Sequence, residues 1–290
     1  MFKSEALRKI ETMHPKHDAW EIIRLAMLYE FPWDLNRGTE FALYKTYAVP
    51  SISSLLHKTR EFEKFPQKRY DDTDIFISEM LEYGIKDGRG RAALERMNWI
   101  HAQYNISNDD FLYVLSTFLF DVYYWINNFA YRSLTNTEEL AGFYVWKEIG
   151  ENMNIKHIPD SIIEFKQFHD DYEKQNFVYS ETNVKVGKAT EKIFLNMFLP
   201  KYLHGMAKPF LYAVLEPHLL KAFRYEEPGE KMRNFVKQVL QARSKIESFF
   251  PKNKPYYHTK DKKYITYPNG YTIDDLGPDK LMKSAKCPFH

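Results

Sequence analysis

The chain has 290 residues, enough for one large or two small domains with a sizeable hydrophobic core. Its 41 basic and 39 acidic residues leave a net charge of +2, so no global field favours a nucleic acid partner. The single cysteine, Cys287, excludes a disulfide framework and any zinc site built from several cysteines. Aromatic residues make up 17% of the chain, which suits either an aromatic-rich core or a bulky apolar cavity.

Helical periodicity dominates the first third of the chain, and no alternating strand series is present. Asp34 is an N-cap candidate for one helix, and Asp71, Asp72 and Thr73 are N-cap types for another. The predicted helices cover residues 4–12, 18–29, 35–48, 52–62 and 71–83.

The next predicted helix, residues 89–101, carries the most informative side chain. Leu94, Met97, His101 and Tyr104 fall on one helical face, and this face is otherwise apolar. The His101 imidazole is therefore expected to point inward, where an unsatisfied polar group costs about 1–3 kcal/mol. A backbone carbonyl would satisfy the ring, and so would iron; geometry alone favours the carbonyl.

The second half continues as helices. The run from Phe111 to Ile126 is shorter than the ~20 residues of a membrane span. Because Asp121 also interrupts it, we expect a buried helix, capped at Ser107. Thr135 and Glu138 form a capping-box pattern that starts the next helix. Further helices are predicted over 159–174, 182–198, 202–216 and 230–250, with His169-Asp170-Asp171 on a solvated polar face.

The character of the sequence changes after Pro251, so we expect a helical domain over residues 1–250 and a basic, turn-rich tail over 251–290. The tail is predicted to be solvated or to wrap the domain; its lysines are candidates for peripheral contact with an anionic membrane. The charged N-terminal residues 1–10 lack the apolar core of a signal peptide, which predicts a cytoplasmic protein.

Several catalytic motifs are absent from the sequence, including His-Glu-x-x-His, the Walker A loop and the Gly-x-Ser-x-Gly elbow. His101 is left as the one candidate ligand on an apolar helix face. One histidine cannot hold a free metal ion, but it can hold haem, because the porphyrin already supplies the equatorial ligands of the iron. Arg69, Arg96 and Arg132 are candidate anchors for haem propionates, and the aromatic helix after Ser107 is a candidate slot.

A family resemblance rests on motifs in a fixed order. They are Tyr29 to Trp33, Arg69-Tyr-Asp-Asp-Thr73, Gly90 to His101, Ile106 to Phe118 and Tyr267-Pro-Asn-Gly-Tyr271. Together they resemble the mpaB/rubber-oxygenase (latex clearing protein-like) catalytic domain, in its mpaB-like branch. The similarity covers about residues 18–278.

The resemblance implies a single all-α domain with globin-like helix packing around haem b, and cleavage of isoprenoid double bonds with O2. It places His101 at the proximal iron ligand. Arg69 and Thr73 match the family's distal Arg-x-x-Lys-Thr element, but Asp72 stands where the lysine would be. Asp72 and Thr73 are then distal polar groups, and Arg69 and Arg132 contact propionates or the distal side. Phe118 and Trp125 are the expected pocket walls.

The leading hypothesis is therefore a haem b-dependent oxygenase that acts with O2 on a small, apolar, unsaturated, isoprenoid-like substrate. The first alternative is a non-catalytic helical protein that binds haem or a lipophilic ligand, since Asp72 replaces the family's lysine. The second is a helical scaffold in which His101 is a satisfied core residue.

Overall fold

The computed structural model describes residues 3–250 and 252–282, without the side chain of Phe198. Cys287 and the predicted tail residues 251 and 283–290 lie outside these described residues. The described residues form helices and connecting loops with no strand, which confirms the all-α prediction.

The helices of the first half are α1 (Glu5–Ile10), α2 (Ala19–Leu25), the π-helix η1 (Ala26–Glu30), α3 (Pro32–Thr46), α4 (Pro50–Thr59), α5 (Glu61–Lys64), α6 (Pro66–Tyr83), α7 (Gly88–His101), α8 (Asn108–Phe129) and α9 (Asn136–Asn152). Those of the second half are α10 (Ile162–Asn176), α11 (Glu181–Phe198), the 3-10 helix η2 (Lys201–Leu203), α12 (His204–Ala213), α13 (Pro217–Phe223), α14 (Glu230–Glu247), α15 (His258–Asp261), the 3-10 helix η3 (Ile273–Asp275) and α16 (Asp279–Met282).

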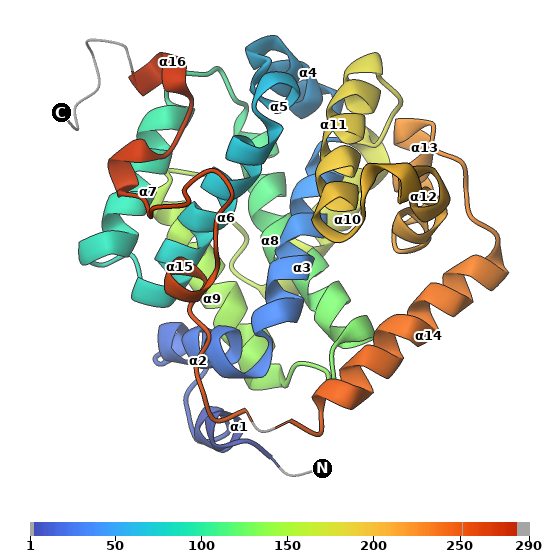
Figure 1. Ribbon diagram of the computed structural model, residues 1–290. Helices are drawn as coiled ribbons and strands as arrows, with labels where there is room; N and C mark the ends of the chain where they lie inside the picture. The colour runs from blue at the N-terminus through green and yellow to red at the C-terminus, as the bar shows by residue number, and fades with distance from the viewer. Residues whose placement is uncertain (1–2, 251, 283–290) are drawn as a thin grey trace.

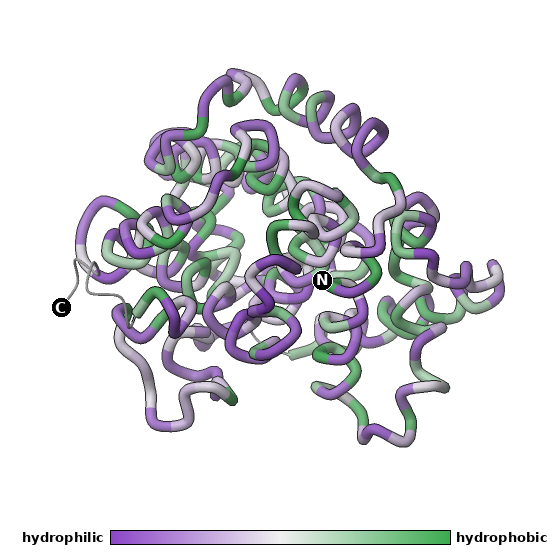
Figure 2. The backbone as a smooth tube through the Cα atoms, turned by 90° about the horizontal axis from the view of Figure 1, so that it is seen from above, coloured by the Kyte–Doolittle hydropathy of each residue, from purple (hydrophilic) through white to green (hydrophobic). Residues whose placement is uncertain are grey.

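Helices α3 and α8 cross at the centre of the molecule, and the other helices surround them (Figure 1). Gly38 allows this close approach, because a Cβ atom there would lie 3.0 Å from the Cα of Val122 on α8. The long apolar helix predicted after Ser107 is α8, and it is buried as expected. Along the tube in Figure 2, hydrophilic and hydrophobic residues alternate within most helices, as amphipathic packing requires. Within the described residues, no helix combines the length and apolarity needed to cross a bilayer.

Two predicted helix starts are wrong for one physical reason. Helix α6 begins at Pro66 rather than near Asp71, and α3 begins at Pro32 rather than after Asp34. Proline is favoured in the first helical turn because its missing N–H would have no partner there. Asp71, Asp72 and Thr73 are therefore interior residues of α6.

Two predicted caps are confirmed. The Ser107 side chain accepts from the backbone N–H of Asp110, and Thr135 forms a reciprocal capping box with Glu138. The helix predicted over 202–216 is instead divided between η2 and α12, and α13 after it was not predicted.

The chain after α14 wraps the helical body. It returns past α2 and runs over α6 and α7 to α16 (Figure 1). The backbone N–H of Tyr256 donates to the Leu28 carbonyl at 2.9 Å, and Lys262 pairs with Asp74 at 2.9 Å. The described part of the predicted tail therefore packs on the domain, and Lys262 lies against it rather than free in solvent.

Candidate active site

One large cavity lies between α3, α4, α6, α7, α8 and α9, with a volume of about 450 Å³. This volume falls within the ~300–1,000 Å³ typical of small-molecule sites. Its floor is formed by aromatic and sulfur-containing side chains. Phe118 and Trp146 stack there, with ring centroids 5.1 Å apart. Phe118 thus lies where the sequence analysis expected a pocket wall.

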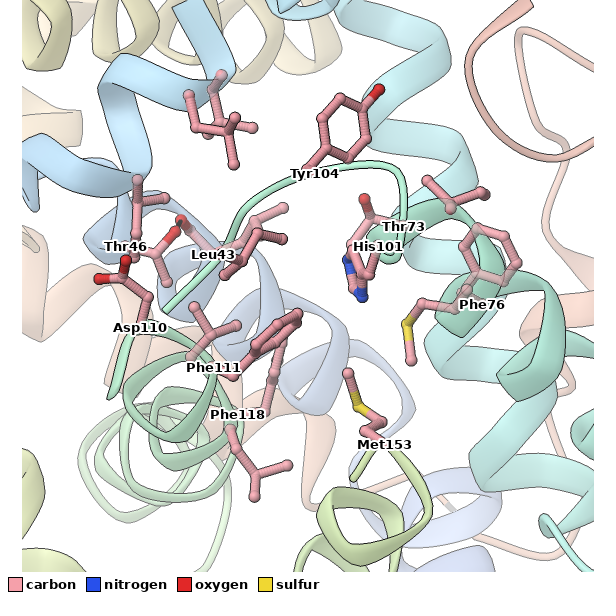
Figure 3. Close-up of a pocket in the computed structure, with 18 of the residues that line it drawn as sticks. Leu43, Thr46, Thr73, Phe76, His101, Tyr104, Asp110, Phe111, Phe118 and Met153 are labelled. Carbon is pink, nitrogen blue, oxygen red and sulfur yellow. Dashed lines mark hydrogen bonds between the residues drawn. The ribbon is translucent and has the colours of Figure 1, made fainter. Parts of the chain in front are cut away.

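His101 ends α7 and points its imidazole into the cavity, towards the side chains of Phe111 and Met153 (Figure 3). The ring packs edge-on against Phe111 at a centroid distance of 5.3 Å. Nδ1 is buried and has no hydrogen-bond partner in the part of the chain that the structure describes. The backbone carbonyl favoured by geometry alone is thus not found at this nitrogen.

Burial and then the positive charge of Arg69 lower the pKa of His101 from 6.5 to about 4. The imidazole is therefore neutral near pH 7. A neutral ring is the form that can donate a lone pair to a metal.

Arg69 and Thr73 reach the same cavity from α6. Arg69, Thr73, Phe76, Ile77 and Met80 all line it, and their spacing is that of one helical face. The Arg69 guanidinium lies 5.4 Å from the Phe62 ring centroid, and no ion pair or hydrogen bond engages it within the described residues. The hydroxyl of Thr73 donates to the Arg69 carbonyl at 2.9 Å. Arg69 thus offers a guanidinium without an ion pair or hydrogen bond to whatever the cavity holds, although its charge also acts on nearby Asp72.

Tyr47 is a cavity residue that the sequence analysis missed. It is 1% exposed, and its hydroxyl is buried without a hydrogen-bond partner among the described residues. Its ring is fixed edge-on against Phe62, with centroids 5.0 Å apart. Burial raises the pKa of the Tyr47 hydroxyl well above its usual range, so it is a neutral donor. No local signal separates it from the other tyrosines of α3.

Asp72 lies outside the cavity lining. Neighbouring residues on a helix point about 100° apart, so Asp72 leaves the face that carries Arg69 and Thr73. Its carboxylate accepts from Lys68 at 3.2 Å, from the Tyr267 hydroxyl and from the backbone N–H of Gly277 at 3.1 Å. Burial raises the pKa of Asp72, while the charge of Lys68 opposes this rise. Asp72 thus anchors the C-terminal segment and does not reach the cavity.

Arg96, Arg132 and Trp125 also lie away from the cavity. Arg96 donates to the Leu276 carbonyl at 3.1 Å and to the Asp274 carbonyl at 2.8 Å. Arg132 pairs with Glu30 and Glu138, each at 2.7 Å.

Trp125 stacks on Phe41 at 4.9 Å and donates its indole N–H to Asp34 at 3.2 Å. Each of the three residues has at least one partner from a distant part of the sequence. The structure thus brings His101, Arg69, Thr73 and Phe118 together and leaves these three aside.

A second polar cluster joins α3, α8, α10 and the start of α13, and it corrects the prediction for His169. His169 is 3% exposed and hydrogen-bonds Ser116 at 2.9 Å, because it shares one buried face of α10 with Phe165 and Glu173. Two overlapping groups of potential metal ligands occur here, Asp121–His169–Glu173 and Glu173–Glu216–His218.

The ammonium of Lys45 lies inside this cluster, 2.7 Å from Asp121, 2.8 Å from Glu173 and 2.9 Å from Glu216. These three charges raise the pKa of Lys45 well above its usual range although burial opposes them, so it remains a cation. Lys45 therefore holds the position that a metal ion would take between these carboxylates.

The fold and the cavity define a helical protein that can enclose a small, largely apolar molecule beside a neutral histidine. No family model matches the chain. Three curated relatives do match it. "ER-bound oxygenase mpaB′" of Penicillium brevicompactum is 26% identical over 90% of this chain and 81% of its own length.

"ER-bound oxygenase mpaB" of Penicillium roqueforti (strain FM164) is 30% identical over 72% of this chain and 76% of its own length. The mpaB of Penicillium brevicompactum is 36% identical over 43% of this chain and 34% of its own length. The chain belongs to the mpaB-like family of oxygenases.

Proposed function

We propose that the chain is a haem b-dependent oxygenase that uses O2 to oxidise an apolar, unsaturated, isoprenoid-like substrate. The observation that carries the proposal is the His101 imidazole, neutral and without a partner at Nδ1, at the wall of a 450 Å³ apolar cavity. Arg69, which forms no ion pair within the described residues, lies on the same wall and supports the proposal, because the two propionates of haem need cationic anchors.

The residues present fit this cofactor. His101 would bind the haem iron, Arg69 would pair with a propionate, and Phe118 would pack on the cofactor or the substrate. Haem would supply the iron on which O2 chemistry depends. Thr73 would orient the bound reactants by accepting a hydrogen bond, since its own proton is already donated to Arg69. The dry aromatic wall would exclude water from the reacting double bond.

The comparison proteins are named ER-bound. We therefore extend the proposal to a cytoplasmic protein that associates peripherally with a membrane, where apolar isoprenoid substrates partition.

The test is a visible absorption spectrum of the purified protein, taken as isolated and then with dithionite and carbon monoxide. We expect a Soret band that shifts on reduction and again on binding carbon monoxide. The variant His101→Ala is expected to lose the band while keeping its helical circular dichroism. His57→Ala, which removes a surface histidine paired with Glu63, is the matched control and retains the band.

Each other outcome has a distinct meaning. Absence of a Soret band even after reconstitution with hemin would overturn the haem proposal. Stoichiometric haem in His101→Ala would overturn the ligand assignment alone. Haem binding without O2 uptake on a panel of prenylated lipids would favour the alternative, a helical carrier of haem or a lipophilic ligand.

A further inference from the structure

Helix α14 carries a row of apolar side chains on its exposed surface. Phe235, Val239, Ala242 and Ile246 are spaced by three or four residues, so they form one stripe along the helix, and Phe249 follows in the turn just after its end. Ile246 is 62% exposed and Phe249 is 86% exposed. Soluble domains scatter single exposed apolar residues, but an ordered stripe marks an interaction surface.

The inner face of α14 already accounts for its packing on the body. Val236 and Ser244 are buried, Leu240 packs against the cluster around Trp125, and Arg243 pairs with Asp34 at 2.6 Å. The stripe lies next to this face on the helix surface, and most of its side chains are exposed. In Figure 1 the helix lies along the edge of the molecule.

The exposed apolar surface continues onto α12. The rings of Phe210 and Phe235 meet edge-on, with centroids 6.2 Å apart. Met206 lies one turn before Phe210 on the same side of α12 and is 74% exposed. Tyr202 on η2 extends the surface further and is also exposed. Two elements therefore present one apolar surface, which we call the α12–α14 face.

Basic side chains border this face. Lys201 precedes Tyr202, Lys231 lies one turn before Phe235, and Lys245 lies beside Ile246. All three are exposed, and none forms an ion pair within residues 3–250 and 252–282. Glu247, one of the two acidic residues of α14, is neutralised by Arg243 at 3.1 Å and by Lys252. The other acidic residue, Glu230, is exposed beside Lys231, but the three lysines outnumber it, so the border is positive on balance.

We infer that the α12–α14 face docks onto a lipid bilayer that contains anionic headgroups. An apolar helical stripe bordered by lysines is the pattern of a helix that lies in the membrane interface, with aromatic and aliphatic side chains among the acyl chains. The inference assigns membrane contact to the α12–α14 face rather than to the C-terminal segment. There Lys252 and Lys262 are paired with Glu247 and Asp74, and the exposed Lys254, Lys260 and Lys263 lie on loops or the four-residue α15, without an apolar helical stripe.

The test is co-sedimentation of the full chain with vesicles. Vesicles of phosphatidylcholine with phosphatidylserine are expected to pellet the protein, and pure phosphatidylcholine vesicles are expected to pellet clearly less. The double variant Ile246→Glu/Phe249→Glu should reduce binding to the anionic vesicles at least tenfold. Ile163→Glu is the matched control because Ile163 is 79% exposed but lies on α10, and it should bind as the parent does.

A stability measurement and a second variant separate loss of membrane contact from loss of folding. The thermal midpoint of the double variant should equal that of the parent, because both positions are exposed. Lys231→Gln/Lys245→Gln should reduce the preference for anionic vesicles while leaving the weak binding to neutral ones. The inference is overturned if the parent ignores both kinds of vesicle, or if the double variant binds like the parent. It is equally overturned if the parent is a dimer that the double variant converts to a monomer.

Discussion

Two buried polar groups at the cavity wall have no hydrogen-bond partner in the described chain: Nδ1 of His101 and the hydroxyl of Tyr47. The half-buried guanidinium of Arg69 lines the same cavity without a hydrogen bond or ion pair among the described residues. Some other polar side chains there bond to the protein. The Thr46 hydroxyl donates to the Leu43 carbonyl at 2.7 Å, and Ser51 donates to Asp110 at 2.7 Å. Buried polar groups are rarely left unpaired in native proteins. The two buried unpaired groups therefore indicate where a ligand makes its polar contacts.

Tyr47→Phe tests this argument without any activity assay. Removing an unpartnered buried hydroxyl should leave the unfolding free energy of the ligand-free protein unchanged or raise it by up to about 1 kcal/mol. If the hydroxyl donates to a cavity ligand, hemin should bind about fivefold more weakly, because a lost hydrogen bond is worth roughly 1 kcal/mol. Urea unfolding of the ligand-free protein and a hemin titration provide the two measurements.

Tyr44→Phe is the control on the same helix. The Tyr44 hydroxyl donates to the Gly187 carbonyl at 3.2 Å and contacts the Tyr225 hydroxyl at 3.1 Å. Its loss should destabilise the protein by about 1 kcal/mol and leave hemin affinity unchanged. Equal destabilisation by both variants would contradict the argument, because it would show that the Tyr47 hydroxyl has a partner in the folded chain.

Periodicity predicted some of these site residues and missed others. His101 could be found because its own helix face is apolar. Arg96 could not be placed, because the carbonyls that it binds lie 178 and 180 residues away. Asp72 was misplaced because the Arg-x-x-Lys-Thr spacing was followed residue by residue. A single step along a helix turns the side chain to another face.

At the scale of elements, the C-terminal segment closes one side of the cavity. Pro278 lines the cavity, and the preceding Gly277 donates its N–H to Asp72 at 3.1 Å. Gly277 has a φ of 111°, and a Cβ atom there would lie 2.6 Å from Cδ1 of Ile100, next to His101. The close approach of this segment to α7 therefore requires glycine.

Gly277→Ala is expected to lower the unfolding free energy by about 2–4 kcal/mol, through an unfavourable backbone angle and a clash with Ile100. Gly270→Ala is the control. Gly270 also has a positive φ, 90°, but no atom lies within 4 Å of its Cβ position. Gly270→Ala should lower the unfolding free energy by only about 1–2 kcal/mol, because only the backbone angle is unfavourable there. Denaturant unfolding measures both, and equal losses would show that contact with Ile100 does not matter.

Helix boundaries were predictable where a side chain caps the helix and less so where proline begins it. Ser107 and Thr135 each make the hydrogen bond that their sequence pattern predicted. Before α6, Pro66 and the polar residues at 71–73 both resemble start signals, and the structure uses the proline. The start of α6 matters for the site, because it sets which residues of α6 face the cavity.

At the scale of the whole molecule, the all-α class followed from local periodicity, but the network that ties the helices together did not. Lys45, Asp121, His169 and Glu173 come from three helices, and their separations in sequence carry no local signal. His169 was therefore assigned to a solvated face on the evidence of its neighbours Asp170 and Asp171, which are indeed exposed.

The charges in this network depend on one another. Burial alone would raise the pKa of Glu173, but hydrogen bonds from His169 and His218, together with the Lys45 charge, hold it well below its usual range. Asp121 differs, because burial raises its pKa in spite of Lys45. Removing the lysine would leave both carboxylates more costly to keep ionised in a buried site.

Lys45→Met is therefore expected to lower the unfolding free energy at pH 7 by about 3–5 kcal/mol, because it leaves buried carboxylates without their cation. Lys147→Met is the control, because Lys147 pairs at 2.5 Å with Asp160, which is 97% exposed, and its loss should cost less than about 1 kcal/mol.

The pH dependence gives the sharper test. A carboxyl whose folded pKa lies above its unfolded value destabilises the protein at high pH, and this penalty disappears as the pH falls through the folded pKa. The deficit of Lys45→Met relative to the parent should therefore shrink between pH 7 and pH 5. In the parent, the lowered pKa of Glu173 contributes to the unfolding free energy at neutral pH. This contribution should be lost only in acid, below the usual pKa of a glutamate. A deficit that is constant with pH, measured by urea unfolding, would show that Lys45 stabilises the molecule by packing rather than by charge.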